Sequence, residues 1–130
     1  REITVGIVAG EALPPVEIEC PGEMYDYDAK YTHAQGQTLY HCPPWHVSET
    51  GQRRAQEMAV RFYRALGARD MIRVDFIVVD DVEMYILEAN TIPGFTASSL
   101  LPKSAKHEGM SFEMLCSRLV KLAWDRKYGR

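Results

Sequence analysis

The chain has 130 residues, of which 46% are hydrophobic and 25% are charged, and its formal net charge is −3. These values are typical of one compact globular domain with its own core. They exclude the basic surface that nucleic-acid binding requires, and no apolar run reaches the roughly 18–20 residues of a membrane span, so we expect neither a nucleic acid nor a membrane as a partner.

The N-terminal third predicts short strands around a long loop. Apolar and β-branched residues predict strands over 3–8, 16–19 and 38–41. Residues 21–37 are rich in Gly, Asp and Tyr and show little periodicity, which indicates a loop of the length that is usually functional or mobile. Because the chain starts at Arg1, directly before a strand and without an initiator Met, we expect a fragment of a longer protein.

An amphipathic helix is predicted in the middle of the chain. Ser48 is a suitable N-cap, and Gly67 is a suitable residue directly after the helix. Between them, apolar residues recur at i, i+3, i+4, i+7 and i+11, which is the spacing of one helical face. These residues are Ala55, Met58, Ala59, Phe62 and Leu66.

The C-terminal half predicts a hairpin, a loop and a last helix. Strands are predicted over 71–79 and 84–88, and residues 91–103, with two prolines, predict a loop with a helical turn near Ser99. Ser111 caps the last helix, in which Cys116 is expected to be a small core residue. The order of elements favours an α+β fold with helices packed on a mixed or antiparallel sheet. The predicted inner face of the last helix consists of Phe112, Leu115, Leu119, Leu122 and Ala123.

The predicted hairpin brings four polar residues to one face. A turn centred in the middle of residues 80–83 places Asp75 opposite Glu88 and Arg73 opposite Asn90. Residues two apart on a strand share a face, so all four side chains project to the same side. Opposed Cβ atoms lie roughly 4.5–5.5 Å apart, and two carboxylates at that distance repel each other unless a cation lies between them.

This residue set suits a magnesium and phosphate site. Mg²⁺ is a hard cation that takes oxygen ligands and substrate phosphates, Asn90 adds a neutral oxygen, and Arg73 is left to contact a phosphate or an oxyanion. The alternative is that Asp75 and Glu88 are solvated on an open sheet face, which is the commoner case for one acidic pair. The turn at residues 93–94 leaves the backbone approachable by a ligand, but the residues alone leave both interpretations open.

The cysteines and histidines carry less information. Three cysteines without a Cys-x-x-Cys pair indicate a reduced, cytosolic protein. His41, Cys42 and His46 lie close together in the sequence, as zinc ligands can, but no second ligand pair is placed to complete a tetrahedral site.

Several short motifs follow one another in a characteristic order. The clearest are Arg73-Val74-Asp75 and Leu87-Glu88-Ala89-Asn90-Thr91; the others lie at residues 1–6, 11–18, 25–31, 42–43, 93–96, 98–100, 102–103 and 109–112. Over nearly the whole chain, this series resembles the C-terminal part of the ATP-grasp fold of D-alanine–D-alanine ligases. So many motifs in one order make the resemblance specific.

The resemblance implies roles for residues of the hairpin and the turn after it. Asp75, Glu88 and Asn90 match the ligands of Mg²⁺, which Mn²⁺ can replace. Arg73 matches an arginine that stabilises the acyl-phosphate and the tetrahedral intermediate, and the Gly94 N–H matches an oxyanion donor.

Other residues are matched to the substrates. The resemblance implies that Ser99 and Leu100 hold the carboxylate of the second D-alanine. Lys30 matches a lysine that contacts phosphate, and Tyr31 matches a tyrosine in the hydrogen-bond network that closes a mobile loop over the site.

The resemblance implies ATP-dependent ligation of two D-alanine molecules through an acyl-phosphate, for peptidoglycan precursor synthesis in the bacterial cytoplasm, by a homodimeric enzyme. Residues 1–130 would be its C-terminal ATP-grasp subdomain, which needs the N-terminal and central domains of the parent ligase and is not expected to ligate alone. Two alternatives stay open: a non-catalytic subdomain that binds Mg²⁺ or nucleotide weakly or pairs with another chain, and a ligase whose second substrate is D-serine or D-lactate.

Overall fold

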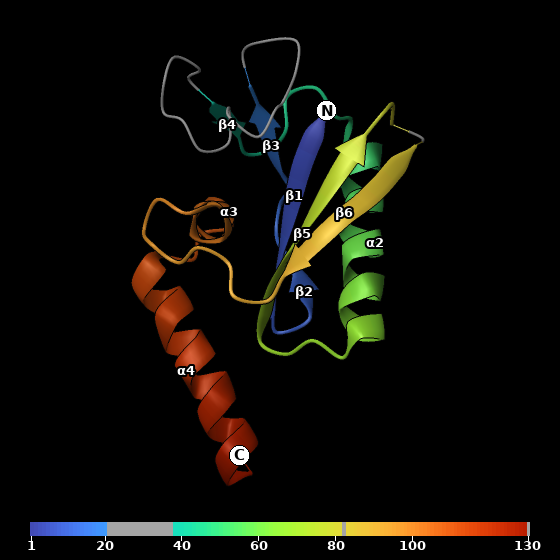
Figure 1. The fold of residues 1–130 in the computed structure, drawn as a ribbon. Coiled ribbons are helices and arrows are strands. Elements are labelled where there is room, and N and C mark those ends of the chain that lie inside the picture. The colour runs from blue at the N-terminus through green and yellow to red at the C-terminus, as the bar shows by residue number, and fades with distance from the viewer. Residues whose placement is uncertain (21–37, 82, 130) are drawn as a thin grey trace.

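The computed structural model describes residues 1–20, 38–81 and 83–129. Within these segments the elements follow in an α+β order that agrees with the predicted fold class. They are β1 (Glu2–Val8), β2 (Glu11–Ala12), β3 (Val16–Glu19), β4 (Leu39–His41), α2 (Glu49–Leu66), β5 (Met71–Val78), β6 (Met84–Asn90), α3 (Leu100–His107) and α4 (Phe112–Tyr128) (Figure 1). No helix in the described segments is long and apolar enough to cross a membrane.

The described strands form one antiparallel sheet. Their order is β4-β3-β1-β5-β6, with β2 paired to the end of β1. The ladder between β1 and β5 runs from Glu2 opposite Ile77 to Val8 opposite Met71. Of the two sheet types that the sequence left open, the antiparallel one is therefore correct, and β6 lies at an edge of the sheet.

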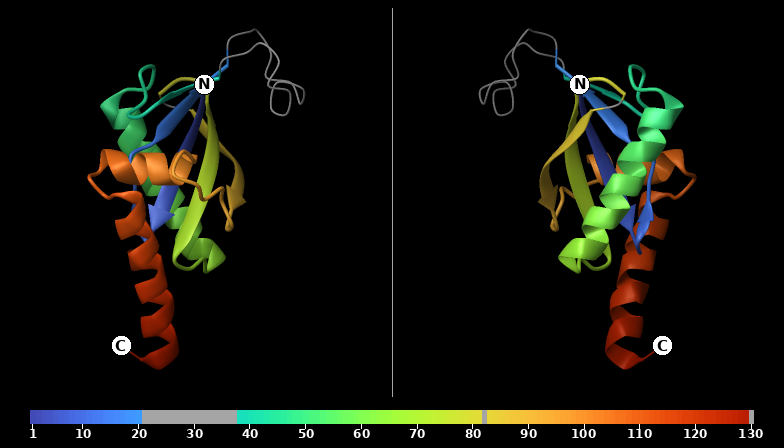
Figure 2. Two further views of the ribbon diagram at one scale, coloured as in Figure 1. Left: turned by 90° about the vertical axis from the view of Figure 1, so that its left-hand side faces the viewer. Right: turned by 90° about the vertical axis from the view of Figure 1, so that its right-hand side faces the viewer.

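Helices cover both faces of this sheet, as the two side views show (Figure 2). Helix α2 packs on one face, over a core that includes the fully buried Ile3 and Phe76. On the other face, α3 and α4 pack over a smaller cluster that includes Val8, Leu101 and Leu115. The alternation of side chains along β1 and β5 therefore supplies two cores from one sheet.

Helix α2 begins and ends where the sequence predicts. The Ser48 side chain accepts a hydrogen bond from the Gly51 N–H at 3.0 Å, and Gly67 takes a left-handed conformation with φ of 65°, which glycine adopts without strain. Ala55 is fully buried, as predicted, whereas Leu66 is 52% exposed. The prediction was wrong for Leu66 because periodicity does not show where the covering sheet ends.

Residues 91–103 are not a loop throughout. Helix α3 begins at Leu100, directly after its N-cap Ser99. Pro102 favoured a loop in the sequence, but it occupies the third helical position, where the missing N–H would have no partner within the helix. The predicted helical turn near Ser99 is thus the start of an 8-residue helix, and the loop prediction for residues 100–103 was wrong.

Helix α4 starts at the predicted cap, with the Ser111 side chain accepting a hydrogen bond from the Met114 N–H at 3.2 Å. Leu115 is fully buried, but Ala123 is exposed and Cys116 is only partly buried. The prediction that both of these residues face the core was wrong. For Ala123, Figures 1 and 2 show the reason: the C-terminal turns of α4 extend beyond the sheet.

Candidate functional site

The β5–β6 hairpin carries the four polar residues of the candidate site. Asp75 lies opposite Glu88, and Arg73 lies opposite Asn90. Both predicted pairs are therefore confirmed. Strand β6 continues to Asn90, two residues beyond its predicted end at Glu88, so that the ladder also holds the carboxamide in place.

The hairpin reaches these pairs through an irregularity that the sequence did not indicate. Phe76 pairs with Ile86, and the next pair along β5 is Asp75 with Glu88, so Leu87 is an extra residue on β6. Without this bulge, the same turn would have placed Asp75 opposite Leu87. The predicted pairs are right, but the regular register assumed for the whole hairpin was wrong.

Asp75 is buried and already hydrogen-bonded. The Thr4 hydroxyl donates to Asp75 Oδ1 at 2.6 Å, and Arg73 donates from Nε to Oδ1 at 3.1 Å and from Nη2 to Oδ2 at 3.2 Å. The sequence left Arg73 to contact a phosphate or an oxyanion, and that role stays a prediction; in this structure Arg73 pairs with Asp75. The guanidinium offsets the charge of a carboxylate that is 4% exposed.

Glu88 and Asn90 are exposed beside this pair. The Glu88 carboxylate makes no hydrogen bond or ion pair with any described residue. Asn90 Oδ1 accepts a hydrogen bond from the Ile92 N–H at 3.0 Å, which turns the chain sharply after β6. The face of the hairpin therefore presents one satisfied carboxylate, one open carboxylate, and a carboxamide whose oxygen accepts one hydrogen bond and keeps a second acceptor position.

The turn after β6 brings Gly94 to the start of α3. A Cβ atom at Gly94 would lie 3.3 Å from Ser99 Oγ, so the absence of a side chain keeps this backbone accessible. Ser99 Oγ accepts a hydrogen bond from the Thr96 N–H at 2.9 Å and makes no cap hydrogen bond to α3. The first N–H groups of α3, from Leu100 onward, are thus not capped by the Ser99 side chain and suit an anion.

The donor atoms of the hairpin fit Mg²⁺ in type. Asp75, Glu88 and Asn90 offer carboxylate and carboxamide oxygens, which this hard cation prefers. Across the described segments, no three His, Cys, Asp or Glu side chains are grouped so that they could hold a metal by themselves. A cation at the hairpin would need water or phosphate oxygens as further ligands, and Mg²⁺ commonly keeps such ligands.

The remaining site residues are placed as follows. Lys30 and Tyr31 lie outside the described residues. Leu100 is half-buried at the start of α3. Thr4 is a site neighbour that the sequence did not reveal, because its place opposite Asp75 depends on the long-range pairing of β1 with β5.

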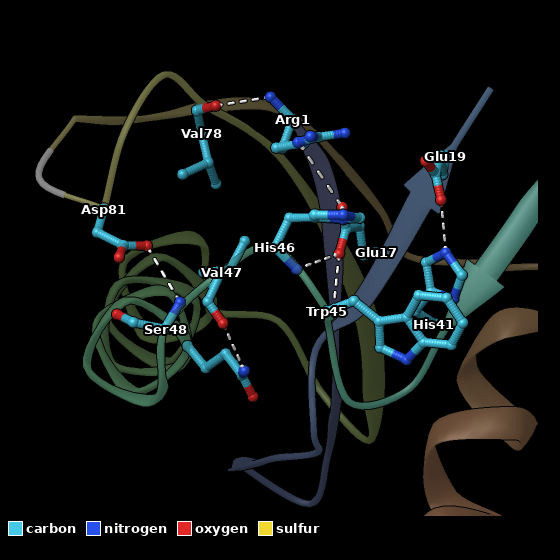
Figure 3. A network of polar contacts seen from close by, with 11 residues as sticks. Arg1, Glu17, Glu19, His41, Trp45, His46, Val47, Ser48, Val78 and Asp81 are labelled. Carbon is cyan, nitrogen blue, oxygen red and sulfur yellow. Dashed lines mark hydrogen bonds and ion pairs between the residues drawn. The ribbon is translucent and has the colours of Figure 1, made fainter. Parts of the chain in front are cut away.

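A second polar network surrounds Glu17, which is fully buried (Figure 3). Its Oε2 accepts hydrogen bonds from the N–H groups of Trp45 at 2.8 Å and His46 at 2.9 Å, and its Oε1 lies 2.8 Å from His46 Nδ1. Burial by itself would raise the pKa of Glu17, but the hydrogen bonds from His46 and Trp45 outweigh it, so the pKa lies below its ordinary value. Apolar and acidic residues alternate along residues 16–19, and this pattern gave no sign that the Glu17 carboxylate is buried.

The same network accounts for the residues considered as zinc ligands. His41 Nε2 lies 2.7 Å from Glu19 Oε2, and the His41 ring stacks on Trp45 with centroids 3.7 Å apart. Burial raises the pKa of the Cys42 thiol, which disfavours the thiolate that metal binding needs. These contacts hold the turn before α2 and form no zinc site among the described residues.

Comparison with known proteins places this geometry in a family. The model of the D-ala D-ala ligase C-terminus matches residues 1–121. The D-alanine–D-alanine ligase of Syntrophotalea carbinolica is 44% identical over 126 residues, which are 97% of this chain and 40% of that protein. The ligase of Neisseria meningitidis serogroup C is 40% identical over 122 residues, which are 94% of this chain and 40% of that protein.

Solved structures agree with the sequence relatives. The D-alanine–D-alanine ligase of Bacillus anthracis, complexed with ATP, matches with a TM-score of 0.75 and 28% identity, over 95% of this chain and 38% of that one. The VanG D-Ala:D-Ser ligase of Enterococcus faecalis matches with a TM-score of 0.78 and 31% identity, over 93% of this chain and 35% of that one. The chain thus spans about 40% of the length of the curated relatives it matches.

Proposed function

The chain belongs to the family of D-alanine–D-alanine ligase C-terminal regions, and we propose from this premise that it supplies the metal-binding and oxyanion-stabilising half of an ATP-dependent ligase that joins two D-alanine molecules. Such ligation serves peptidoglycan precursor synthesis, which would place the enzyme in the bacterial cytoplasm. Because the chain spans about 40% of its relatives, the activity is proposed for the whole ligase and not for this region alone.

The observation that carries the proposal is the register of the β5–β6 hairpin. It sets Asp75 opposite Glu88 and Arg73 opposite Asn90 on one face. The other face of β5 is filled by core residues, so the direction of these side chains is fixed by folding. A site whose geometry is set before the substrate arrives loses less entropy on binding.

Asp75, Glu88 and Asn90 would hold Mg²⁺, or Mn²⁺ in its place, which offsets the charge of the ATP phosphates. Asp75 Oδ1 already accepts hydrogen bonds from Thr4 and Arg73. Asp75 Oδ2 accepts one hydrogen bond and keeps a second acceptor position, so it is the ligand atom that we assign. Glu88 needs no rearrangement, since it makes no bond to a described residue.

The remaining assignments follow the charges that develop in the reaction. The carboxylate of the first D-alanine takes the γ-phosphoryl group of ATP and ADP leaves; the amine of the second D-alanine then attacks the acyl carbon and phosphate leaves. Arg73 would stabilise the acyl-phosphate and the tetrahedral intermediate. The exposed Gly94 N–H, which donates to no described group, would donate to the oxyanion.

The second substrate would bind at the start of α3. Ser99 and Leu100 present the N-terminal end of this helix, where the dipole and the open N–H groups favour a carboxylate. We assign Lys30 to a phosphate contact and Tyr31 to closure of the loop over the site, which keeps water from the acyl-phosphate.

Two further candidates follow from specific observations. The match to a D-Ala:D-Ser ligase makes D-serine, and by extension D-lactate, an alternative second substrate, although the curated relatives at 40–44% identity are named for D-alanine. The 40% coverage also allows a non-catalytic module that binds Mg²⁺ or nucleotide weakly or pairs with another chain. The whole ligase is proposed as a homodimer.

A chimeric enzyme tests the proposal. In the Syntrophotalea carbinolica ligase, this chain replaces the matching 126-residue region, and phosphate release is measured with ATP, Mg²⁺ and D-alanine, D-serine or D-lactate. We expect turnover that is fastest with D-alanine, no turnover by the isolated chain, and a loss of about 100-fold or more for Glu88→Gln. Glu83→Gln, in the exposed turn of the same hairpin, is the matched control. Turnover that is unchanged by Glu88→Gln combined with Asn90→Ala would refute the metal assignment.

A further inference from the structure

We propose that Thr4 is a positioning residue for the metal ligand Asp75. Its hydroxyl holds one oxygen of the carboxylate in place while the other oxygen opens toward the cation. This role rests on the proposed function, because it concerns the same metal site, and it adds a residue of β1 to a site so far built from the hairpin. It follows from a difference between the two side chains that donate hydrogen bonds to Asp75.

The position of Thr4 is fixed by the sheet. Thr4 lies directly opposite Asp75 in the ladder between β1 and β5, and on its other side it lies opposite Val16 of β3. It is 2% exposed, and its β-branched side chain is stiff about the Cα–Cβ bond. The hydroxyl therefore occupies a place that is set when the domain folds.

The single proton of the Thr4 hydroxyl is directed to Asp75. Thr4 Oγ1 lies 2.6 Å from Asp75 Oδ1 and 3.3 Å from the Val74 carbonyl oxygen. A hydroxyl has one proton to donate, and the shorter contact, to an ionised acceptor, is the stronger of the two. Thr4 thus gives Asp75 a charge-assisted hydrogen bond at a buried position, where the low dielectric strengthens it.

Arg73 is the other donor to this carboxylate, and it differs from Thr4 because it can leave. Among the residues that the structure describes, Oδ1 of Asp75 accepts from Thr4 and from Arg73 Nε, whereas Oδ2 accepts from Arg73 Nη2 alone. The Arg73 side chain is 20% exposed and has many rotamers. When it turns to a phosphate or an oxyanion, Oδ2 becomes free for a cation and Oδ1 keeps the hydrogen bond from Thr4.

Without the Thr4 hydroxyl, this exchange would leave Asp75 with no donor. The last torsion of an aspartate side chain is broad, and Asp75 faces the Glu88 carboxylate across the ladder, so an unheld carboxylate would rotate away. The hydrogen bond from Thr4 limits this rotation. Partners of this kind orient metal ligands, and their loss typically lowers metal affinity by about 10- to 100-fold.

Mn²⁺ binding to the chain tests this role without any need for turnover. The dissociation constant is measured from the electron paramagnetic resonance signal of free Mn²⁺, with Mn²⁺ as the only ligand added. Thr4→Val removes the hydroxyl and keeps the β-branched shape, and Thr4→Ala removes it without a methyl group in its place. Both should weaken binding by about 10-fold or more, whereas Thr4→Ser keeps the donor and should bind Mn²⁺ like the wild type.

Ser104→Ala is the matched control for a purely structural effect. Ser104 is another buried hydroxyl, 1% exposed, and it donates to the carbonyl oxygen of Pro14, between β2 and β3. Its loss should lower the free energy of unfolding in urea and leave Mn²⁺ binding unchanged, whereas the loss of the Thr4 hydroxyl should change both. If Thr4→Val and Ser104→Ala are destabilised alike and both bind Mn²⁺ like the wild type, Thr4 is only a structural residue and the proposal is overturned.

Two further variants separate the role of Thr4 from the metal site itself. Because Arg73 shares the carboxylate, Thr4→Val should weaken Mn²⁺ binding more in an Arg73→Ala chain than in the wild type. Glu88→Gln removes a proposed ligand and should weaken binding in every background. If Glu88→Gln weakens binding but neither Thr4→Val nor Thr4→Ala does so, the role of Thr4 is refuted and the metal site stands. If Glu88→Gln leaves binding unchanged, the metal site is refuted, and the role of Thr4 with it.

Discussion

Two buried carboxylates, Glu17 and Asp75, are satisfied in different ways. Glu17 accepts hydrogen bonds from two backbone N–H groups and contacts His46, so its partners are fixed by the fold. Asp75 is held by the side chains of Thr4 and Arg73, and a long side chain such as Arg73 can be rearranged. We therefore regard Glu17 as a structural residue and Asp75 as a residue of the site.

The lowered pKa of Glu17 predicts a pH dependence of stability. A carboxyl group whose pKa is lower in the folded state stabilises the fold above its unfolded pKa, near 4.5, and loses this contribution as the pH falls through the lower folded value. Urea unfolding from neutral to acid pH should show this loss in the wild type. Glu17→Gln should be less stable at neutral pH by about 2–4 kcal/mol and should depend less on pH below 4.5. If the free energy of unfolding changed with pH in the same way in the wild type and in Glu17→Gln, the lowered pKa of Glu17 would be contradicted.

Arg73 and a metal ion offer alternative charges for the same carboxylate. In Arg73→Ala, Asp75 faces Glu88 without a guanidinium, so we expect the thermal unfolding midpoint of the variant to fall. Adding Mg²⁺ should raise the midpoint of this variant more than that of the wild type, because a bound ligand stabilises the folded state. The further change Glu88→Gln should remove most of the Mg²⁺ effect. A Mg²⁺ effect of equal size in the wild type, Arg73→Ala and the double variant would argue against a cation site between these strands.

At the scale of elements, the sequence predicted the helix ends that depend on neighbouring residues, but it did not predict the features that depend on long-range strand pairing. Ser48, Gly67 and Ser111 end or begin helices as predicted, because caps depend on nearby residues. The start of α3 agrees with the predicted helical turn near Ser99, but its continuation through residues 100–103 was missed, because Pro102 is tolerated at a position that sequence composition does not mark. The bulge at Leu87 and the contact of Thr4 with Asp75 depend on strand pairing and were also missed.

The bulge makes an unusual deletion tolerable. Without Leu87, Ile86 still faces Phe76 and Glu88 still follows opposite Asp75, so the ladder becomes regular and no side chain changes face. We expect the deletion of Leu87 to leave a folded domain, in contrast to the deletion of Ala89, which would turn Asn90 toward the core. Urea unfolding and amide spectra distinguish them, and equal damage by the two deletions would contradict the proposed pairing.

The first turn of α2 packs closely against the hairpin turn. A Cβ atom at Gly51 would lie 2.7 Å from Asp81 Oδ1 and 2.9 Å from Val47 Cγ1, and the Ser48 N–H donates to Asp81 Oδ1 at 3.2 Å. Gly51→Ala should therefore lower the free energy of unfolding by about 1–3 kcal/mol, despite the better helix propensity of alanine. Thr50→Ala, at an exposed neighbouring residue, is the control. If Gly51→Ala is as stable as this control, Asp81 and Val47 can move away from the added methyl group at little cost, and the prediction is wrong.

At the scale of the whole molecule, the two faces of the antiparallel sheet differ in what they carry. The face toward α2 forms the larger core, and the opposite face carries the carboxylates of the hairpin and the start of α3. The sequence predicted one part of this division, that Arg73, Asp75, Glu88 and Asn90 project to the same side of the hairpin. It did not predict that the C-terminal turns of α4 extend beyond the sheet, since helical spacing alone does not show how much of a helix a domain covers.

The most direct test of the central claim is a crystal structure of the chimeric ligase with ADP, Mn²⁺ and a phosphinate mimic of the intermediate. Anomalous density locates Mn²⁺ independently of its ligands. We predict a metal ion bound by Asp75, Glu88 and Asn90, with Arg73 in contact with the mimic. A metal ion bound elsewhere, with Asp75 still paired to Arg73 and Glu88 in solvent, would contradict the proposed site.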